Sequence, residues 1–161
     1  YMKIEFGCGE TPTKSGFMTC DIRNVEGVDF VCPAWKIDDF VRESTVDEIF
    51  SRHFFEHLTF RQGRVVLEKW FKILKPQGKM HMMLPNLDFH INQYNTKSNM
   101  KHALAGLYGW QRGEFDDTWD THKSGYSFSL LEPILKECGY VNIQNLRKNK
   151  NRHLEVCCYK P

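Results

Sequence analysis

The sequence predicts an α/β fold: a Rossmann-like sheet of seven mostly parallel strands that closes with an antiparallel hairpin at its carboxyl end. Three observations lead to this prediction. Short apolar runs typical of strands alternate with segments of helical periodicity. The first apolar run breaks into a Gly-x-Gly turn. The last two runs are separated by only a few residues, too few for the crossover that joins parallel strands.

The seven expected strands are short and rich in apolar or β-branched residues. They lie at Lys3–Phe6, Phe17–Cys20, Val28–Val31, Val46–Ser51, Lys79–Leu84, Val141–Leu146 and Leu154–Tyr159. Strands that alternate with helices form a mostly parallel sheet. Only Arg147–Arg152 separates the last two strands, and a parallel crossover needs about a dozen residues or more. The final pair is therefore expected to be antiparallel.

Three helices are expected between the strands. The clearest covers Phe60–Leu74, and a capping box at Thr59–Gln62 marks its start. A second covers Ser129–Cys138, with Ser129 as its N-cap and a glycine directly after its last residue. A short third helix is expected at Ile37–Glu43.

The glycine turn after the first strand indicates a nucleoside site. Gly7 and Gly9 permit positive φ angles and carry no Cβ, so the backbone there can approach a ligand closely. Asp21 ends the next strand and offers a carboxylate that a ribose diol can bond. NAD is disfavoured, because Pro12 stands where a third glycine is needed and Asp21 follows Gly9 too soon. The first crossover is accordingly shortened, with no room for a full helix.

The bulk composition predicts a single domain, residues 1–161, without a membrane span. The net charge is +2 over 161 residues and the basic residues are scattered, which does not favour nucleic acid as a partner. No apolar stretch is long enough to cross a bilayer. The six cysteines have no disulfide-framework spacing, so we expect reduced thiols, no metal and a cytoplasmic location.

Several motifs, in their order along the chain, resemble those of class I S-adenosylmethionine-dependent methyltransferases. They are Glu5-Phe-Gly-Cys-Gly9, Cys20-Asp21, Val46-Asp-Glu-Ile-Phe50, His53-Phe-Phe-Glu-His-Leu58, Leu74-Lys-Pro-Gln-Gly78 and Leu84-Pro-Asn-Leu-Asp88. The chain is most similar to the small predicted methyltransferases often associated with surface-polysaccharide genes, also in His122-Lys-Ser-Gly-Tyr126. The resemblance covers most of the chain and is weakest between Ile91 and Thr121.

The resemblance implies S-adenosylmethionine as the cofactor and S-adenosylhomocysteine as its product. The glycine turn would line the methionine and ribose side, Asp21 would bond the ribose, and the segment after the third strand would lie along the adenine. The implied cofactor-binding residues are Glu5, Gly7, Cys8, Gly9, Asp21, Ile22, Ala34, Trp35, Ser51 and His53. The sequence departs from the family pattern at Pro33, where an acidic residue is common.

Three residues are candidates for the catalytic base or for binding the methyl acceptor: His53, Asp88 and His122. His53 follows the fourth strand at its carboxyl end, the edge of an open α/β sheet where ligands bind. His90 is a further candidate. The implied reaction is methyl transfer to a small molecule or a glycan, for example to a sugar hydroxyl, and a general base assists when the acceptor is a hydroxyl.

The segment 89–126 shows little clear periodicity, and we expect it to be a lid or substrate-binding insertion. Its aromatic residues argue against disorder, and Trp110 and Trp119 are candidates for stacking on an acceptor. The alternative is a peripheral helix whose apolar stripe includes Met100 and Leu104.

Two other functions are open at this point. His53-Phe-Phe-Glu56-His57 matches the H-x-x-E-H pattern of inverted zinc metallopeptidases, which requires a long helix that presents both histidines on one face. A strand-like run ends just before His53 and a new helix begins soon after His57, so this alternative is disfavoured. The second alternative is a cofactor-binding module that has lost catalysis.

Overall fold

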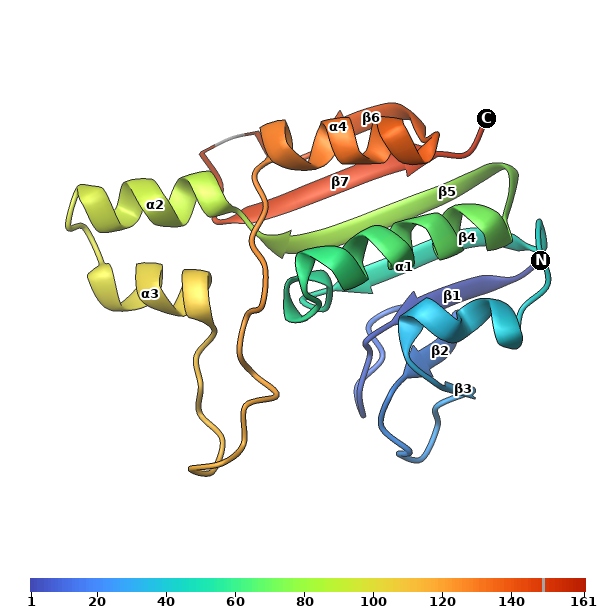
Figure 1. Cartoon of the computed structure of the whole chain (residues 1–161), viewed down its shortest axis with the longest axis horizontal. Helices are drawn as coiled ribbons and strands as arrows, with labels where there is room; N and C mark the ends of the chain where they lie inside the picture. The colour runs from blue at the N-terminus through green and yellow to red at the C-terminus, as the bar shows by residue number, and fades with distance from the viewer. Residues whose placement is uncertain (149) are drawn as a thin grey trace.

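The computed structural model describes residues 1–148 and 150–161 and contains one seven-stranded sheet in the order β3-β2-β1-β4-β5-β7-β6 (Figure 1). The strands are β1 (Lys3–Phe6), β2 (Met18–Asp21), β3 (Phe30–Val31), β4 (Val46–Arg52), β5 (Leu74–Pro85), β6 (Val141–Asn145) and β7 (His153–Tyr159). All seven expected strands are present. Their ends differ from the prediction by one or two residues, except that β5 begins earlier, directly after the preceding helix.

The directions of the strands confirm the predicted topology. The strands β1 to β5 pair in parallel. The strand β7 pairs antiparallel with both β5 and β6, so the last strand lies between the two strands that precede it. The connection of this closing hairpin includes Asn149, which lies outside the described residues.

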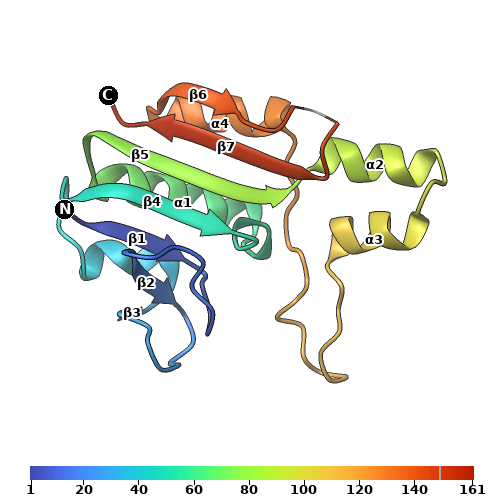
Figure 2. The same ribbon diagram turned by 180° about the vertical axis from the view of Figure 1, so that it is seen from behind.

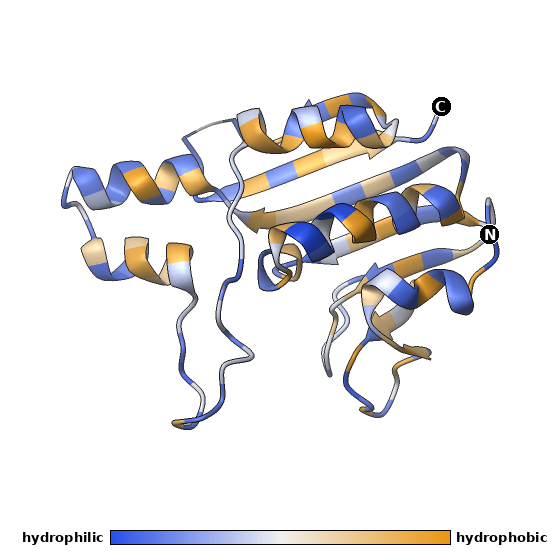
Figure 3. Ribbon diagram, in the orientation of Figure 1, coloured by the Kyte–Doolittle hydropathy of each residue, from blue (hydrophilic) through white to orange (hydrophobic). Residues whose placement is uncertain are grey.

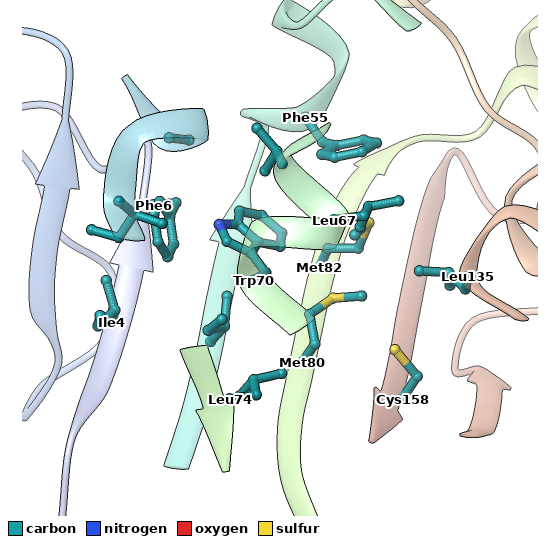
Figure 4. Packing of buried hydrophobic residues seen from close by; sticks show 14 of the residues in the cluster. Ile4, Phe6, Phe55, Leu67, Trp70, Leu74, Met80, Met82, Leu135 and Cys158 are labelled. Carbon is teal, nitrogen blue, oxygen red and sulfur yellow. The ribbon is translucent and has the colours of Figure 1, made fainter. Parts of the chain in front are cut away.

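Helices cover one face of the sheet, and the core lies beneath them (Figures 1 and 4). They are the 3₁₀ helix η1 (Ala34–Asp39) and the helices α1 (Phe60–Ile73) and α4 (Phe128–Cys138). Hydrophobic and hydrophilic residues alternate along α1 and α4, as helices with one buried side require (Figure 3). At the centre, the fully buried ring of Trp70 lies 4.8 Å from Phe6 and 6.2 Å from Phe55, centroid to centroid. Burying each such side chain contributes about 1.5–3 kcal/mol.

No helix among the described residues covers the opposite face, where the strands lie in front in Figure 2. Right-handed crossovers from β1 to β2 and from β2 to β3 would place helices there. Both connections, residues 7–17 and 22–29, are loops without a helix. This face carries ion pairs such as those of Glu48 with Lys3 and Lys79, and the loop after β1 packs Phe17 and Lys14 against the buried ring of Phe50. The predicted shortening of the first crossover is thus confirmed and extends to the second.

Three helix boundaries test the sequence-based assignments. The capping box of α1 forms: Thr59 accepts from the Gln62 amide, and the Gln62 side chain accepts from the Thr59 amide. The predicted N-cap of α4 was wrong, because Ser127 is the extended residue whose hydroxyl accepts from the Leu130 amide. The short helix expected at Ile37–Glu43 is η1, which starts three residues earlier than expected.

The segment expected to be irregular contains two helices, so that expectation was wrong. They are α2 (Leu87–Asn95) and α3 (Met100–Tyr108), which pack against each other beyond the end of the sheet (Figures 1 and 2). The suggested apolar stripe was also wrong, because Met100 and Leu104 are exposed while Ala103 and Ala105 are buried. From α3 the chain returns to α4 through residues 109–127. Among the described residues, no helix combines the length and apolar character that a membrane span needs.

Candidate functional site

Two adjoining cavities lie at the carboxyl ends of the parallel strands. The first, about 330 Å³, is lined by residues that follow β1, β2, β3 and β4, and we call it the glycine-turn cavity. The second, about 390 Å³, has six histidines in its wall, and we call it the histidine cavity. His53 and His57 line both. A side chain between two cavities can act on ligands in either of them.

The glycine turn is required by close packing on its backbone. Gly7 and Gly9 have φ angles of +69° and +56°, which side-chain-bearing residues rarely adopt. A Cβ on Gly7 would lie 2.3 Å from the ring of Phe54, and a Cβ on Gly9 would lie 2.1 Å from the Arg23 guanidinium. Phe54 and Arg23 both line the glycine-turn cavity. The two glycines therefore let these side chains lie directly on the turn.

Asp21 joins the glycine turn to the end of β2. Its Oδ2 accepts from the Gly9 amide at 2.8 Å, and its Oδ1 accepts from the Arg23 amide at 2.9 Å and from Arg23 Nε at 3.3 Å. A carboxylate has about four acceptor positions. With three occupied, Asp21 retains capacity to accept from a ligand hydroxyl in the cavity that it lines.

The structure brings six of the ten predicted cofactor-binding residues to the wall of the glycine-turn cavity. They are Gly7, Asp21, Ile22, Ala34, Trp35 and His53. Ile22 follows β2, and Ala34 and Trp35 begin η1, so three successive strand ends contribute. Pro33 also lines the wall, and no carboxylate occupies that position. The assignment of these residues to a cofactor stays a prediction.

The other four predicted residues do not line this wall. The Glu5 carboxylate accepts from the amide and hydroxyl of Thr13 and from the amide of Lys14, so it holds the loop after β1. Gly9 contributes its amide to Asp21. The hydroxyl of Ser51 is buried, with no hydrogen-bond partner among the described residues.

Cys8 lies in the glycine turn and is half-buried. Burial, followed by the negative charges of Asp21 and Glu5, raises the pKa of its thiol to about 11. The thiol is therefore neutral at physiological pH. Because the thiolate is the nucleophilic form, Cys8 is placed as a packing residue of the turn.

Residues that the sequence analysis did not assign to the cofactor complete the glycine-turn cavity; among them, Trp119 was expected to stack on the acceptor. Leu58 and Gln62 come from the start of α1 and the turn before it, and Trp119 and Lys123 come from the connection 109–127. The Arg23 guanidinium lies 5.9 Å from the Trp119 ring, in cation–π geometry. Lys123 is held in place by its amide, which donates to the carbonyl of Glu56 at 2.8 Å. No local sequence pattern indicates these contacts, because the partners are distant along the chain.

Six of the seven histidines in the sequence line the histidine cavity. They are His53, His57, His90, His102, His122 and His153. They come from the turn after β4, from α2, from α3, from the connection 109–127 and from the start of β7. The same cavity contains Glu56, Arg112, Asp120 and Arg152. Elements distant in the sequence thus converge on one strongly polar wall.

Several of these imidazoles are held neutral. Burial lowers the pKa of His90 and of His122. Burial, together with the nearby imidazole of His53 and several arginines, lowers the pKa of His153 to about 4. The His53 and His153 rings lie 5.1 Å apart. Neutral imidazoles can accept protons or bind cations.

The three predicted catalytic residues do not lie together. His53 and His122 line the histidine cavity, whereas Asp88 lies in the first turn of α2 and is absent from both cavity walls. His53 has a φ angle of +49°, which is uncommon outside glycine, in the turn after β4. Its side chain is 40% exposed, so it is accessible from the cavities.

The helix that a zinc metallopeptidase would need does not form. β4 includes Arg52, and only the three-residue 3₁₀ helix η2 (Phe55–His57) lies between it and α1. His53 lies outside η2. The two histidines of the H-x-x-E-H pattern are therefore not one turn apart on a continuous α-helix, as that class of peptidase requires. The structure does not support this alternative.

The comparison with solved structures returns many that share this fold. An S-adenosylmethionine-dependent methyltransferase from Archaeoglobus fulgidus matches with a TM-score of 0.68 and 15% identity over 99% of this chain and 86% of that one. One from Thermotoga maritima, described as a possible histamine N-methyltransferase, matches with a TM-score of 0.66 and 12% identity over 99% and 82%. The 1,6-didemethyltoxoflavin N1-methyltransferase of Burkholderia thailandensis, solved with S-adenosylhomocysteine, matches with a TM-score of 0.61 and 12% identity over 99% and 70%.

No family model and no curated protein matches the sequence. The chain spans 62% of the length of another match, from Bordetella parapertussis, which is described as a possible exported protein. At identities this low the likeness concerns the fold, and function has to be argued from the site. The chain thus has the Rossmann-like fold, with its antiparallel C-terminal strands, that these S-adenosylmethionine-dependent methyltransferases share.

Proposed function

We propose that this chain is a class I methyltransferase that transfers a methyl group from S-adenosylmethionine to an acceptor hydroxyl. The observation that carries the proposal is the pair of adjoining cavities. One is built around the glycine turn and Asp21, and the other is lined by histidines. His53 and His57 stand between them, where a methyl group would pass from donor to acceptor.

The glycine-turn cavity fits the cofactor in size and in chemistry. Its volume of about 330 Å³ lies in the range of ligand pockets, roughly 300–1,000 Å³. Asp21 would accept from the ribose hydroxyls, with Ile22 beside the ribose. Ala34 and Trp35 would lie along the adenine, and backbone groups next to Pro33 would bond its edge. The turn Gly7–Gly9 would lie against the methionine portion.

The remaining predicted residues support this site indirectly. Glu5 would act through the loop that it holds, because its carboxylate is occupied by the loop amides. Ser51 lies at the end of β4 beside the cavity wall, with its hydroxyl available for a bond that a ligand or water would supply. Their substitution is therefore expected to affect cofactor binding through the shape of the site.

The histidine cavity would bind the acceptor. The exposed indole of Trp110 offers an apolar face for a sugar or another ring, and Arg112 and Arg152 offer donors. We propose a small molecule or a glycan as the acceptor, bound beneath α2, α3 and the connection 109–127, which would act as the substrate-binding insertion. The placement of six histidines in this wall favours an acceptor that has to lose a proton.

The bound cofactor supplies an electrophilic methyl group on a sulfonium sulfur. His53 is the proposed general base: it would take the proton of the acceptor hydroxyl as the oxygen bonds to the methyl carbon and the carbon–sulfur bond breaks. Orientation of the two reactants can contribute about 7–11 kcal/mol to lowering the barrier. General-base assistance adds roughly 10²–10⁴-fold.

The first test is calorimetric titration with S-adenosylhomocysteine. A hydrogen bond to a charged group contributes about 1.5–3 kcal/mol, so Asp21→Ala is expected to weaken binding by roughly 10- to 150-fold. Asp21→Asn keeps the shape of the side chain and one acceptor, so its affinity for S-adenosylhomocysteine is expected to lie between those of wild type and Asp21→Ala. Asp39→Ala removes an exposed carboxylate at the end of η1 and is the matched control.

No binding by either protein would reject the cofactor site, and equal binding by wild type and Asp21→Ala would reject the ribose contact assigned to Asp21. Turnover of the methyl donor with hydroxyl-bearing acceptors then separates an enzyme from a binding module. His53→Gln is expected to lower turnover while leaving the affinity for S-adenosylhomocysteine within about tenfold.

A further inference from the structure

Glu56, His57 and His122 form a cluster of potential metal ligands in the wall of the histidine cavity. One ligand atom from each residue lies within 4.8 Å of the others. Glu56 and His57 belong to η2, whereas His122 comes from the connection 109–127. The amides of Lys123 and Ser124 both donate to the carbonyl of Glu56, which fixes this connection beside η2. The cluster is therefore held by backbone hydrogen bonds.

Backbone carbonyls orient the two imidazoles. Nδ1 of His57 lies 3.2 Å from the carbonyl oxygen of Thr121, and Nδ1 of His122 lies 3.0 Å from that of Gly106. A carbonyl only accepts, so each Nδ1 must carry the proton. In the neutral ring Nε2 then has a free lone pair. An N–H donated to a backbone carbonyl, with the other nitrogen free, is the usual arrangement of a metal-binding histidine.

One oxygen of the Glu56 carboxylate, Oε2, lacks a hydrogen-bond partner among the described residues. Glu56 is 2% exposed, so this oxygen is buried. Its Oε1 lies 3.9 Å from Nε2 of His57 and 3.6 Å from Nδ1 of His53. Burying an unpaired carboxylate is costly. The buried carboxylate therefore faces imidazole nitrogens, and a cation could bind to both kinds of group.

We propose that Glu56, His57 and His122 bind a divalent first-row transition cation, with Zn²⁺ as the best match. Two imidazoles and one carboxylate are a ligand set of zinc sites that keep an open position. Mg²⁺ and Ca²⁺ prefer oxygen ligands and fit this set poorly. Ligand atoms about 2.1 Å from a tetrahedral ion lie about 3.4 Å apart, so the side chains close in by about 1 Å on binding.

This site differs from the peptidase pattern considered for the sequence. That pattern pairs His53 with His57 on one helix, whereas here His122 supplies the second imidazole. His53 remains beside the cluster, with Nδ1 near the same carboxylate. It is thus free to serve as a base next to the ion.

The consequence for catalysis, though not the binding itself, rests on the proposed function. The open position of the ion would hold the acceptor hydroxyl and lower its pKa. His53 would receive the proton, the oxygen would bond to the methyl carbon, and the electron pair of the broken carbon–sulfur bond would stay on sulfur. The ion itself is unchanged. The site thus selects acceptors with a hydroxyl that can bind a metal.

The test is titration of the chelator-treated chain, residues 1–161, with Zn²⁺, and with Mg²⁺ as the hard-cation comparison. Wild type is expected to bind one Zn²⁺ per chain, and Mg²⁺ far more weakly. Loss of a group that merely orients a ligand costs 10–100-fold, so Glu56→Gln and His122→Gln should each weaken Zn²⁺ binding at least about tenfold. His102→Gln, in the same cavity but outside the cluster, is the matched control and should bind as wild type does.

Circular dichroism checks that each variant folds. If Glu56→Gln does not fold, the Zn²⁺ affinity of His122→Gln decides the test. The Co²⁺ absorption spectrum, expected in wild type and lost in His122→Gln, reports direct ligation. No stoichiometric Zn²⁺ in wild type, or equal Zn²⁺ affinity in wild type and folded His122→Gln, overturns the proposal. Parallel titration with S-adenosylhomocysteine separates the two hypotheses: Zn²⁺ binding without nucleoside binding supports the metal site and rejects the methyltransferase, and the converse result rejects the metal site alone.

Discussion

The two cavities are built in different ways. The glycine-turn cavity is made largely by successive strand ends, and the hydrogen bond between Gly9 and Asp21 joins two of them within the first strands of the chain. The histidine cavity is made by segments that meet only in the folded chain. Its imidazoles are oriented by carbonyls of distant residues, as in the contact of His122 with Gly106. The first cavity therefore depends on local backbone geometry, and the second on the docking of α2, α3 and their connection.

This difference predicts that changes in the glycine turn affect folding most. Gly7→Ala introduces a positive-φ alanine, which costs about 1–2 kcal/mol, and a clash with Phe54, which adds about 1–3 kcal/mol. We expect a loss of about 2–5 kcal/mol in the free energy of unfolding, measured with urea. Gly16 also has positive φ but open space around it, so Gly16→Ala should show only the first cost. Equal losses in the two variants would mean that Phe54 does not lie on the turn.

A smaller effect is expected where the connection 109–127 lines the glycine-turn cavity. Trp119→Ala removes a ring that lines the glycine-turn cavity and lies over Arg23. Because an exposed cation–π contact contributes about 0.5–1 kcal/mol, affinity for S-adenosylhomocysteine should fall roughly two- to fivefold by calorimetry. Phe115→Ala, a fully exposed aromatic of the same connection, should leave the affinity unchanged. An unchanged affinity in Trp119→Ala would show that the connection does not contribute to the cofactor site.

The last prediction is a pH dependence of stability that belongs to the histidine cavity. The pKa of His153 is lowered to about 4 in the folded chain, against about 6.5 when unfolded. As pH falls from about 6.5 to about 4, the unfolded state takes up a proton first, so stability is lost across this window. His153→Gln should lose less stability over the same window in urea unfolding. An NMR titration that gives His153 an ordinary pKa in the folded protein would contradict this prediction.

The sequence predicted the elements whose signals are local. Gly7 and Asp21 lie in two consecutive motifs at the ends of the first two strands, and both line the same cavity. Thr59 was recognised as a cap because its partner follows three residues later. The cap of α4 was misassigned because Ser127 and Ser129 are equivalent in type. Only the backbone shows that Ser127, with φ −97° and ψ 167°, is the extended residue.

The other features depend on packing that no local pattern encodes. The alternative of a peripheral helix with Met100 and Leu104 agrees with the position of α3, but its buried face was assigned wrongly. The helix α3 buries small residues, Ala103 and Ala105, where the sequence analysis sought large apolar side chains. His102 and His153 carry no motif and reach the histidine cavity only because the elements that bear them dock together. The role of Glu56 depends on His122, which lies far along the chain.

The absence of described helices from one face of the sheet affects how stability depends on temperature. Because the first two connections are loops, apolar side chains concentrate in one layer between the sheet and its single set of helices. Unfolding then exposes less non-polar surface than it would in a sheet covered on both sides. The heat-capacity increment per residue is accordingly smaller, since exposed non-polar surface is what raises it. The fold with one helical layer therefore has a flatter curve of stability against temperature.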